Sequence, residues 1–85
     1  MVKLYIDVII QVDKNGKIDP KYIKAGYEGE WIKVKAKKRN SMASLQLGAV
    51  GVRYTCDIVY NEIPREIYLF GEEDGRWCIE ANDGN

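Results

Sequence analysis

The residues best suited to chemistry in this chain are basic side chains that alternate along one short run. Residues 31–39 read Trp-Ile-Lys-Val-Lys-Ala-Lys-Lys-Arg and contain five basic side chains but no acidic one. Clustered lysine and arginine bind phosphate groups, and neighbouring aromatic rings stack on unpaired bases. Tyr22 and Tyr27 are further candidates for stacking. The sequence therefore predicts, as one of two functional alternatives, nucleic-acid binding by Trp31, Lys33, Lys35, Lys37, Lys38 and Arg39.

The same run also has a purely structural interpretation. Alternating lysines on the outer side of a strand prevent edge-to-edge aggregation, and a net charge of zero is far from the basic balance of most nucleic-acid-binding domains. Residues 1–43 hold ten basic and five acidic side chains, whereas residues 54–85 hold two and eight. Basic and acidic strands that pair as neighbours would explain this segregation. A two-faced molecule that attracts a charged partner or a second copy is the alternative.

No group of side chains in the sequence points to catalysis. The chain has no histidine, which removes the commonest general base and the commonest metal ligand. Cys56 and Cys78 are too far apart for a metal-binding pair. We expect Cys56 to point into the core and Cys78 to point outward as an exposed thiol, and a lone thiol without a neighbouring base is usually inert. The sequence therefore predicts a non-enzymatic protein with no metal and no cofactor.

Two further features have a functional and a structural interpretation each. Arg53 is an isolated cation on the outer side of a predicted strand and is a candidate anchor for an anion. Pairing of this residue with Glu66 or Glu80 is the structural alternative. The runs at 13–16 and 72–75 lack the ligand spacing of a calcium loop, and both are typical of hairpin turns.

Period-two alternation of apolar and polar residues places these side chains on β-strands. The apolar positions of the first strand share one face and are Leu4, Ile6, Val8, Ile10 and Val12. In the basic run, Ile32, Val34 and Ala36 lie opposite the lysines. Pro20 has no backbone N–H, so the second strand is expected to be an edge strand or to bulge there. The predicted strands cover approximately residues 3–12, 17–24, 30–39, 51–60, 65–71 and 76–81.

Six short strands with turn signals between them predict an all-β fold. It is expected to be a small five- to six-stranded antiparallel barrel or a highly curved sheet of the SH3-like or OB-like kind. Eighty-five residues allow one domain, which we place at residues 1–81 and follow with a flexible C-terminal tail at 82–85. Asp7 interrupts the apolar N-terminal run, so we expect no signal peptide, no membrane association and a cytoplasmic location.

The segment 40–51 is uncharged in a chain of which 31% is charged. Its larger apolar side chains cannot all be exposed without forming an apolar patch; they are Met42, Leu45, Leu47 and Val50. The segment either covers an open end of the barrel or forms an interaction loop for a protein partner or a homodimer. The leading functional expectation is therefore a non-catalytic protein-interaction or self-association module, with nucleic-acid binding as the alternative.

Several segments are similar to a known group of proteins. They read Gly-Val-Arg-Tyr-Thr-Cys-Asp-Ile at 51–58, Tyr-Leu-Phe at 68–70, Arg-Trp-Cys-Ile-Glu at 76–80 and Ile-Asp-Pro-Lys-Tyr-Ile at 18–23. Together they resemble small uncharacterised β-barrel proteins of unknown function from Gram-positive bacteria. The chain departs from that pattern in the glycine-containing stretch before Arg53 and at Cys78. The resemblance implies a small barrel and carries no established activity.

Overall fold

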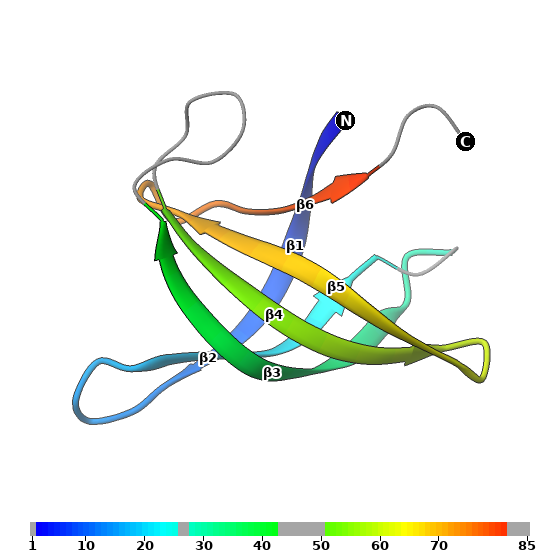
Figure 1. The fold of residues 1–85 in the computed structure, drawn as a ribbon, viewed down its shortest axis with the longest axis horizontal. Coiled ribbons are helices and arrows are strands. Elements are labelled where there is room, and N and C mark those ends of the chain that lie inside the picture. Colours follow the sequence, from blue (N-terminus) through cyan, green and yellow to red (C-terminus); the bar gives the residue numbers. More distant parts are fainter. Residues whose placement is uncertain (1, 26–27, 43–50, 82–85) are drawn as a thin grey trace.

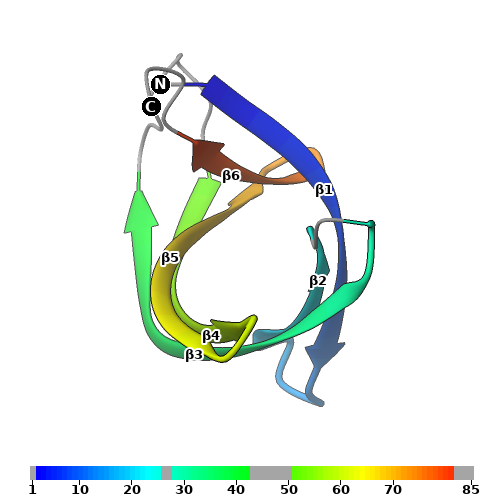
Figure 2. The same ribbon diagram turned by 90° about the vertical axis from the view of Figure 1, so that its right-hand side faces the viewer.

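Six antiparallel strands form the structure, a computed structural model that describes residues 2–25, 28–42 and 51–81. The strands are β1 (Val2–Val12), β2 (Ile18–Lys24), β3 (Trp31–Met42), β4 (Gly51–Tyr60), β5 (Ile63–Glu72) and β6 (Trp77–Ala81). Each strand pairs with its neighbours in the sequence, and β6 pairs back with β1, so that the sheet closes into a barrel (Figure 1 and Figure 2). The prediction of a small all-β antiparallel barrel is confirmed.

β1 closes the barrel because its two halves pair with different strands. Residues 2–6 pair with β6, and residues 7–12 pair with β2. Figure 2 shows β1, in blue, curving round the ring from β6 towards β2. The change of partner falls between Ile6 and Asp7, and it positions the candidate site described below.

β2 bulges at the predicted proline. Pairing steps from Ile9 with Tyr22 to Ile10 with Pro20, so that Lys21 has no partner on β1. Proline fits this position because it has no N–H to donate to a ladder, and the bulge increases the local twist. One of the two predicted alternatives is thereby confirmed. The other, an edge strand, is wrong because β2 pairs on both sides.

Alternate side chains from the strands fill the barrel interior. The buried core consists of Ile23, Ile32, Val34, Tyr54, Cys56, Ile58 and Leu69. Ile32 and Val34 point inward while the lysines between and after them are exposed, as the alternation of the basic run predicts. The apolar face of β1 is covered only near its middle, where Ile6 and Val8 pack against the core, because a strand of 11 residues extends beyond the packed centre of so small a barrel.

The turn between β4 and β5 contains two residues with a left-handed backbone. Asn61 and Glu62 have φ angles of 51° and 64°, and Tyr60 pairs directly with Ile63 across the turn. Two-residue turns of this kind match the right-handed twist of the strands, and they favour asparagine followed by glycine. The turn is therefore tighter than predicted, and β5 begins two residues earlier than expected.

We expect Glu62→Gly to stabilise the barrel by about 0.5–1 kcal/mol, because a left-handed backbone costs an L-residue about 1–2 kcal/mol and the greater unfolded-state entropy of glycine offsets part of the gain. Glu73→Gly is the matched control, since Glu73 is an exposed turn residue whose φ is not positive; this variant should be slightly destabilised. Urea denaturation of both variants at neutral pH measures the difference. An unchanged or lower midpoint for Glu62→Gly would contradict the expectation.

Candidate functional site

The outer side of β1, β2 and β3 carries aromatic and basic side chains in register. One row across the three strands runs from Asp7 through Lys24 to Trp31, and the next row lies two residues further along each strand. The residues of both rows are exposed, whereas the alternate positions Ile23 and Ile32 are buried. We call this surface the aromatic–basic face, and it consists of Tyr5, Asp7, Ile9, Tyr22, Lys24, Trp31, Lys33 and Lys35.

Four large apolar side chains of the aromatic–basic face are open to solvent. The exposed fractions are 45% for Tyr5 and Trp31, 47% for Ile9 and 39% for Tyr22. The ammonium group of Lys24 lies 5.9 Å from the centre of the Trp31 ring. Contiguous exposed apolar surface is typical of a contact site for another molecule, and the lysines among these rings favour an anionic one.

A groove borders this face where β1 changes its pairing partner. Its volume is about 610 Å³, which is within the range of small-ligand pockets. β1, the start of β3, the turn between β5 and β6 and the start of β6 contribute the lining residues, which are Tyr5, Ile6, Asp7, Val8, Trp31, Gly75, Arg76 and Trp77. The guanidinium of Arg76 lies 4.4 Å from the centre of the Tyr5 ring. One wall of the groove therefore consists of the Tyr5 ring and the Arg76 guanidinium that lies over it.

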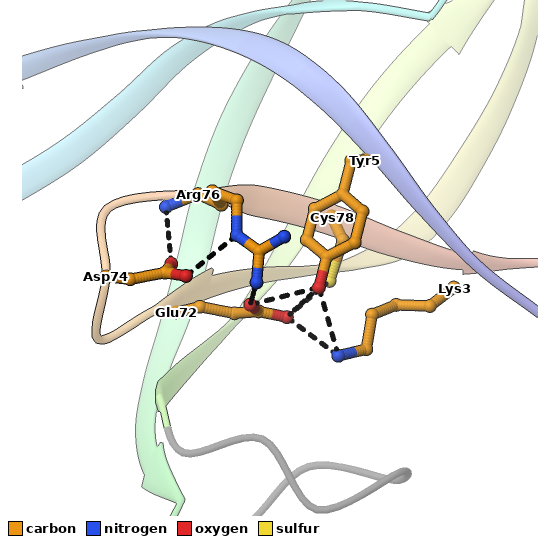
Figure 3. Close-up of polar contacts among 6 residues, drawn as sticks. All are labelled: Lys3, Tyr5, Glu72, Asp74, Arg76 and Cys78. Atoms are coloured by element: carbon orange, nitrogen blue, oxygen red, sulfur yellow. Dashed lines mark hydrogen bonds and ion pairs between the residues drawn. The ribbon is translucent and has the colours of Figure 1, made fainter.

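A buried carboxylate holds that wall in place (Figure 3). The side chain of Glu72 is 5% exposed and accepts hydrogen bonds from the Lys3 ammonium at 2.8 Å and the Tyr5 hydroxyl at 3.0 Å. Arg76 lies 3.4 Å from the same carboxylate and 2.7 Å from that of Asp74. We call these five residues the Glu72 cluster. It fixes the Tyr5 ring and the Arg76 guanidinium without a ligand.

The Glu72 cluster also controls the protonation of its members. The hydrogen bond from Lys3, followed by that from Tyr5, holds the pKa of Glu72 below its usual value, and the same carboxylate raises the pKa of Lys3. The backbone N–H of Arg76 lowers the pKa of Asp74. A carboxyl group whose pKa is lower in the folded state than in the unfolded state stabilises the fold in its ionised form.

The structure divides the predicted nucleic-acid-binding residues. Trp31, Lys33 and Lys35 lie on the aromatic–basic face, but Lys37 sits in a register shift of β3. The ammonium of Lys37 pairs with two carboxylates further round the barrel, at 3.0 Å from Asp57 and 2.7 Å from Glu66. For this lysine the structural interpretation, pairing of basic and acidic neighbouring strands, fits the geometry.

The same register shift separates the end of the basic run from its beginning. Lys38 pairs with Thr55, and Arg39 pairs with Tyr54, whose side chain is buried in the core. Cross-strand partners share a face of the sheet, so Arg39 turns towards the end of the barrel. There it lines a second cleft of about 440 Å³ with residues such as Ile18 and Val52. Arg39 is therefore not part of the aromatic–basic face.

Arg53, the predicted anion anchor, is stacked on an aromatic ring. Its guanidinium carbon lies 4.9 Å from the centre of the Tyr68 ring. Its Nε atom is buried and has no hydrogen-bond partner in the described structure. Glu66, one of its two predicted partners, is bound by Lys37 instead, and the side chain of Glu80 lies outside the described part.

Both cysteines are buried, and they form no disulfide within the described residues. The predicted exposure of Cys78 was wrong, although its side chain does point to the outer side of the sheet, as expected. Trp77 and Ile79 pack against the core, and Cys78 lies between them in the sequence, opposite Tyr5 and Phe70. Its sulfur, however, is covered there and lies 3.7 Å from Glu72. Burial raises the pKa of the Cys56 thiol to about 11, which disfavours the reactive thiolate.

The predicted interaction loop lies largely outside the described residues. β3 ends at Met42 and β4 begins at Gly51, so that Leu45, Leu47 and Val50 fall outside them, as does the predicted tail at 82–85. The interaction of this loop with a protein partner or a second copy stays a prediction.

Sequence reasoning assigned no site role to Tyr5, Ile9 or Arg76. The alternation in β1 placed Tyr5 and Ile9 on the polar side of that strand, which was a usable signal. The alternation does not show which strands pair. The pairing of β1 with β2, and of β2 with β3, brings the polar side of β1 next to Tyr22 and Trp31.

Comparisons with known proteins add no information on the fold or on the candidate site. No protein-family model, curated protein or solved structure matches the chain. The resemblance to barrel proteins of Gram-positive bacteria and the cytoplasmic location therefore stay predictions. Across 2–25, 28–42 and 51–81, no helix is long and apolar enough to span a membrane.

We expect Glu72→Gln to destabilise the barrel at about pH 7, because the neutral amide loses the ion pairs with Lys3 and Arg76. The folded-state pKa of Glu72 lies below its usual value of 4.5, so its stabilisation is complete above that pH and is lost as the pH falls through the lowered folded-state value. The difference in urea midpoint between the two proteins should therefore shrink as the pH is lowered from about 7 to below 4.5. Glu73→Gln, a change at an exposed neighbour, is the control and should differ little from the parent at either pH.

Proposed function

We propose that this barrel is a non-catalytic module that binds single-stranded nucleic acid on its aromatic–basic face. The observation that carries the proposal is the arrangement of three exposed aromatic rings with three lysines on one continuous surface of β1, β2 and β3. The rings belong to Tyr5, Tyr22 and Trp31, and the cations are Lys24, Lys33 and Lys35.

Single strands suit this surface better than duplexes. The bases of a single strand expose their faces, and stacking on an aromatic side chain contributes about 1–3 kcal/mol per base. Tyr22 on β2 and Trp31 on β3 are diagonal neighbours, because they pair with Lys33 and Lys24. Diagonal side chains lie about 7–8 Å apart, so the two rings can contact two bases of one strand. A duplex keeps its bases stacked on one another and offers such rings little surface.

The lysines of the face differ from the lysine whose role is structural. Lys37 is neutralised by Asp57 and Glu66. Within the described part of the chain, by contrast, neither Lys33 nor Lys35 forms an ion pair or a side-chain hydrogen bond. These two charges are available for phosphate groups.

The strand order favours one of the two predicted barrel types over the other. Every strand pairs with its neighbours in the sequence, whereas OB barrels follow a Greek-key order. The SH3-like alternative therefore fits better than the OB-like one. Small barrels serve unrelated functions, so the proposal rests on the surface and not on the fold.

Fluorescence anisotropy with labelled single-stranded oligonucleotides of about 12 nucleotides tests the proposal. We expect saturable binding at low salt that weakens as salt is added, and weaker binding of a duplex of the same sequence. Trp31→Ala should reduce the affinity about 5- to 150-fold, since it removes one stacking platform. Tyr68→Ala is the matched control, because Tyr68 is 48% exposed but lies on β5.

Two results would contradict the proposal. One is the absence of saturable binding at low salt by a protein whose circular dichroism shows it to be folded. The other is an equal loss of affinity in Trp31→Ala and Tyr68→Ala, which would place the contact elsewhere. A protein that ignores nucleic acid but forms dimers in light scattering would favour the interaction-loop prediction instead.

A further inference from the structure

The aromatic–basic face contains a single acidic residue, and it lies beside the groove. Asp7 is two residues from Tyr5 along β1, and it lies in one cross-strand row with Lys24 and Trp31. All four side chains are exposed on the outer side of the sheet. A carboxylate at this position repels phosphate groups, so it opposes the binding of a nucleic-acid backbone.

Asp7 is not used to neutralise the neighbouring lysine. The ammonium of Lys24 lies over the Trp31 ring, and in the part of the chain that the structure describes Asp7 forms no ion pair and no side-chain hydrogen bond. Its oxygens are therefore available to a ligand in the groove, whose lining includes Asp7 together with Tyr5 and Trp31.

The groove combines a fixed aromatic ring with this free acceptor. Tyr5 is held by its hydroxyl on Glu72 and stacked against Arg76. A ring on this wall can stack on a base, and Asp7 can contact the edge of that base. The Arg76 guanidinium is already paired with Asp74 and Glu72, so its part in this wall is to hold the Tyr5 ring.

An ionised carboxylate accepts hydrogen bonds and donates none. Guanine presents two donors side by side on its Watson–Crick edge, the ring N1–H and the 2-amino group, which match the two carboxylate oxygens. Cytosine and adenine present a single amino group there, next to an acceptor that repels the carboxylate. Thymine and uracil present one N–H between two carbonyl oxygens. Among the standard bases, guanine therefore fits an aspartate best.

We propose that the groove is a guanine subsite, in which the base stacks on Tyr5 and its Watson–Crick edge is read by Asp7. This inference rests on the proposed binding of single strands by the adjoining face. It extends that function from binding without sequence preference to recognition of one base.

The test compares oligothymidylates of about 12 nucleotides that carry one central guanine, hypoxanthine, adenine or cytosine. We expect the guanine oligonucleotide to bind about tenfold more tightly than plain oligothymidylate, as for one good bidentate contact. Hypoxanthine keeps N1–H but lacks the 2-amino group, and it should show an intermediate affinity. Asp7→Asn should remove the preference and raise the affinity for plain oligothymidylate, because a charge that repels the phosphates is lost. Glu73→Gln, which removes an exposed charge outside the groove, should keep the preference.

The outcomes separate this inference from the function on which it rests. Equal affinity for all the oligonucleotides would overturn the guanine subsite and leave single-strand binding intact. A guanine preference that survives in Asp7→Asn would overturn the role of Asp7. Failure of the folded protein to bind any of the oligonucleotides at low salt would overturn both proposals.

Discussion

The division of β1 between two ladders is the constraint on which the rest of the structure depends. A strand that pairs with β6 through its first half and with β2 through its second half closes six short strands into a barrel. Closure removes the exposed sheet edges that would otherwise invite aggregation. It also has a local consequence, because β2 and β6 diverge where β1 passes from one to the other. The residues at this point, Tyr5 to Val8, line the groove, so closure of the fold and formation of the candidate site have one origin.

The Glu72 cluster connects this site to the strands that close the barrel. Lys3 and Tyr5 come from β1, Glu72 ends β5, and Arg76 immediately precedes β6 (Figure 3). A buried carboxylate is costly unless hydrogen bonds and opposite charges compensate for its desolvation. Here Lys3, Tyr5 and Arg76 donate to it, and the Cys78 thiol is a fourth, weaker donor. The same contacts hold the Tyr5 ring still before a ligand arrives. Such preorganisation favours binding because fewer side chains must be ordered at that moment.

Periodicity in the sequence predicts the individual strands well, but it predicts poorly which strands and side chains lie next to one another. Alternation identified the inward face of β3 and the missing N–H of Pro20 identified the bulge of β2, since both are properties of single strands. In the sequence, the alternation of basic residues continues to Arg39. In the structure, Lys37 has no partner on β4, and the resulting register shift moves Arg39 off the aromatic–basic face. The sequence contains no turn residue or glycine at this point from which the shift could be predicted. The candidate site is harder still, because the contact of Tyr5 with Glu72 joins residues 67 positions apart.

The neutrality of the chain does not argue against an anionic ligand on one side. Basic residues gather on β1 to β3 and acidic ones on β4 to β6, and the barrel measures 34 × 29 × 20 Å. Charges in solution are screened over about 10 Å at an ionic strength of 0.1 M, so a ligand at one side responds mainly to the charges of that side. The acidic strands repel a polyanion from the far side of the barrel, and the pairing of Lys37 with Asp57 and Glu66 marks the boundary. For the proposed function, this segregation of charge would orient an approaching single strand towards the aromatic rings, an effect that the net charge alone does not reveal.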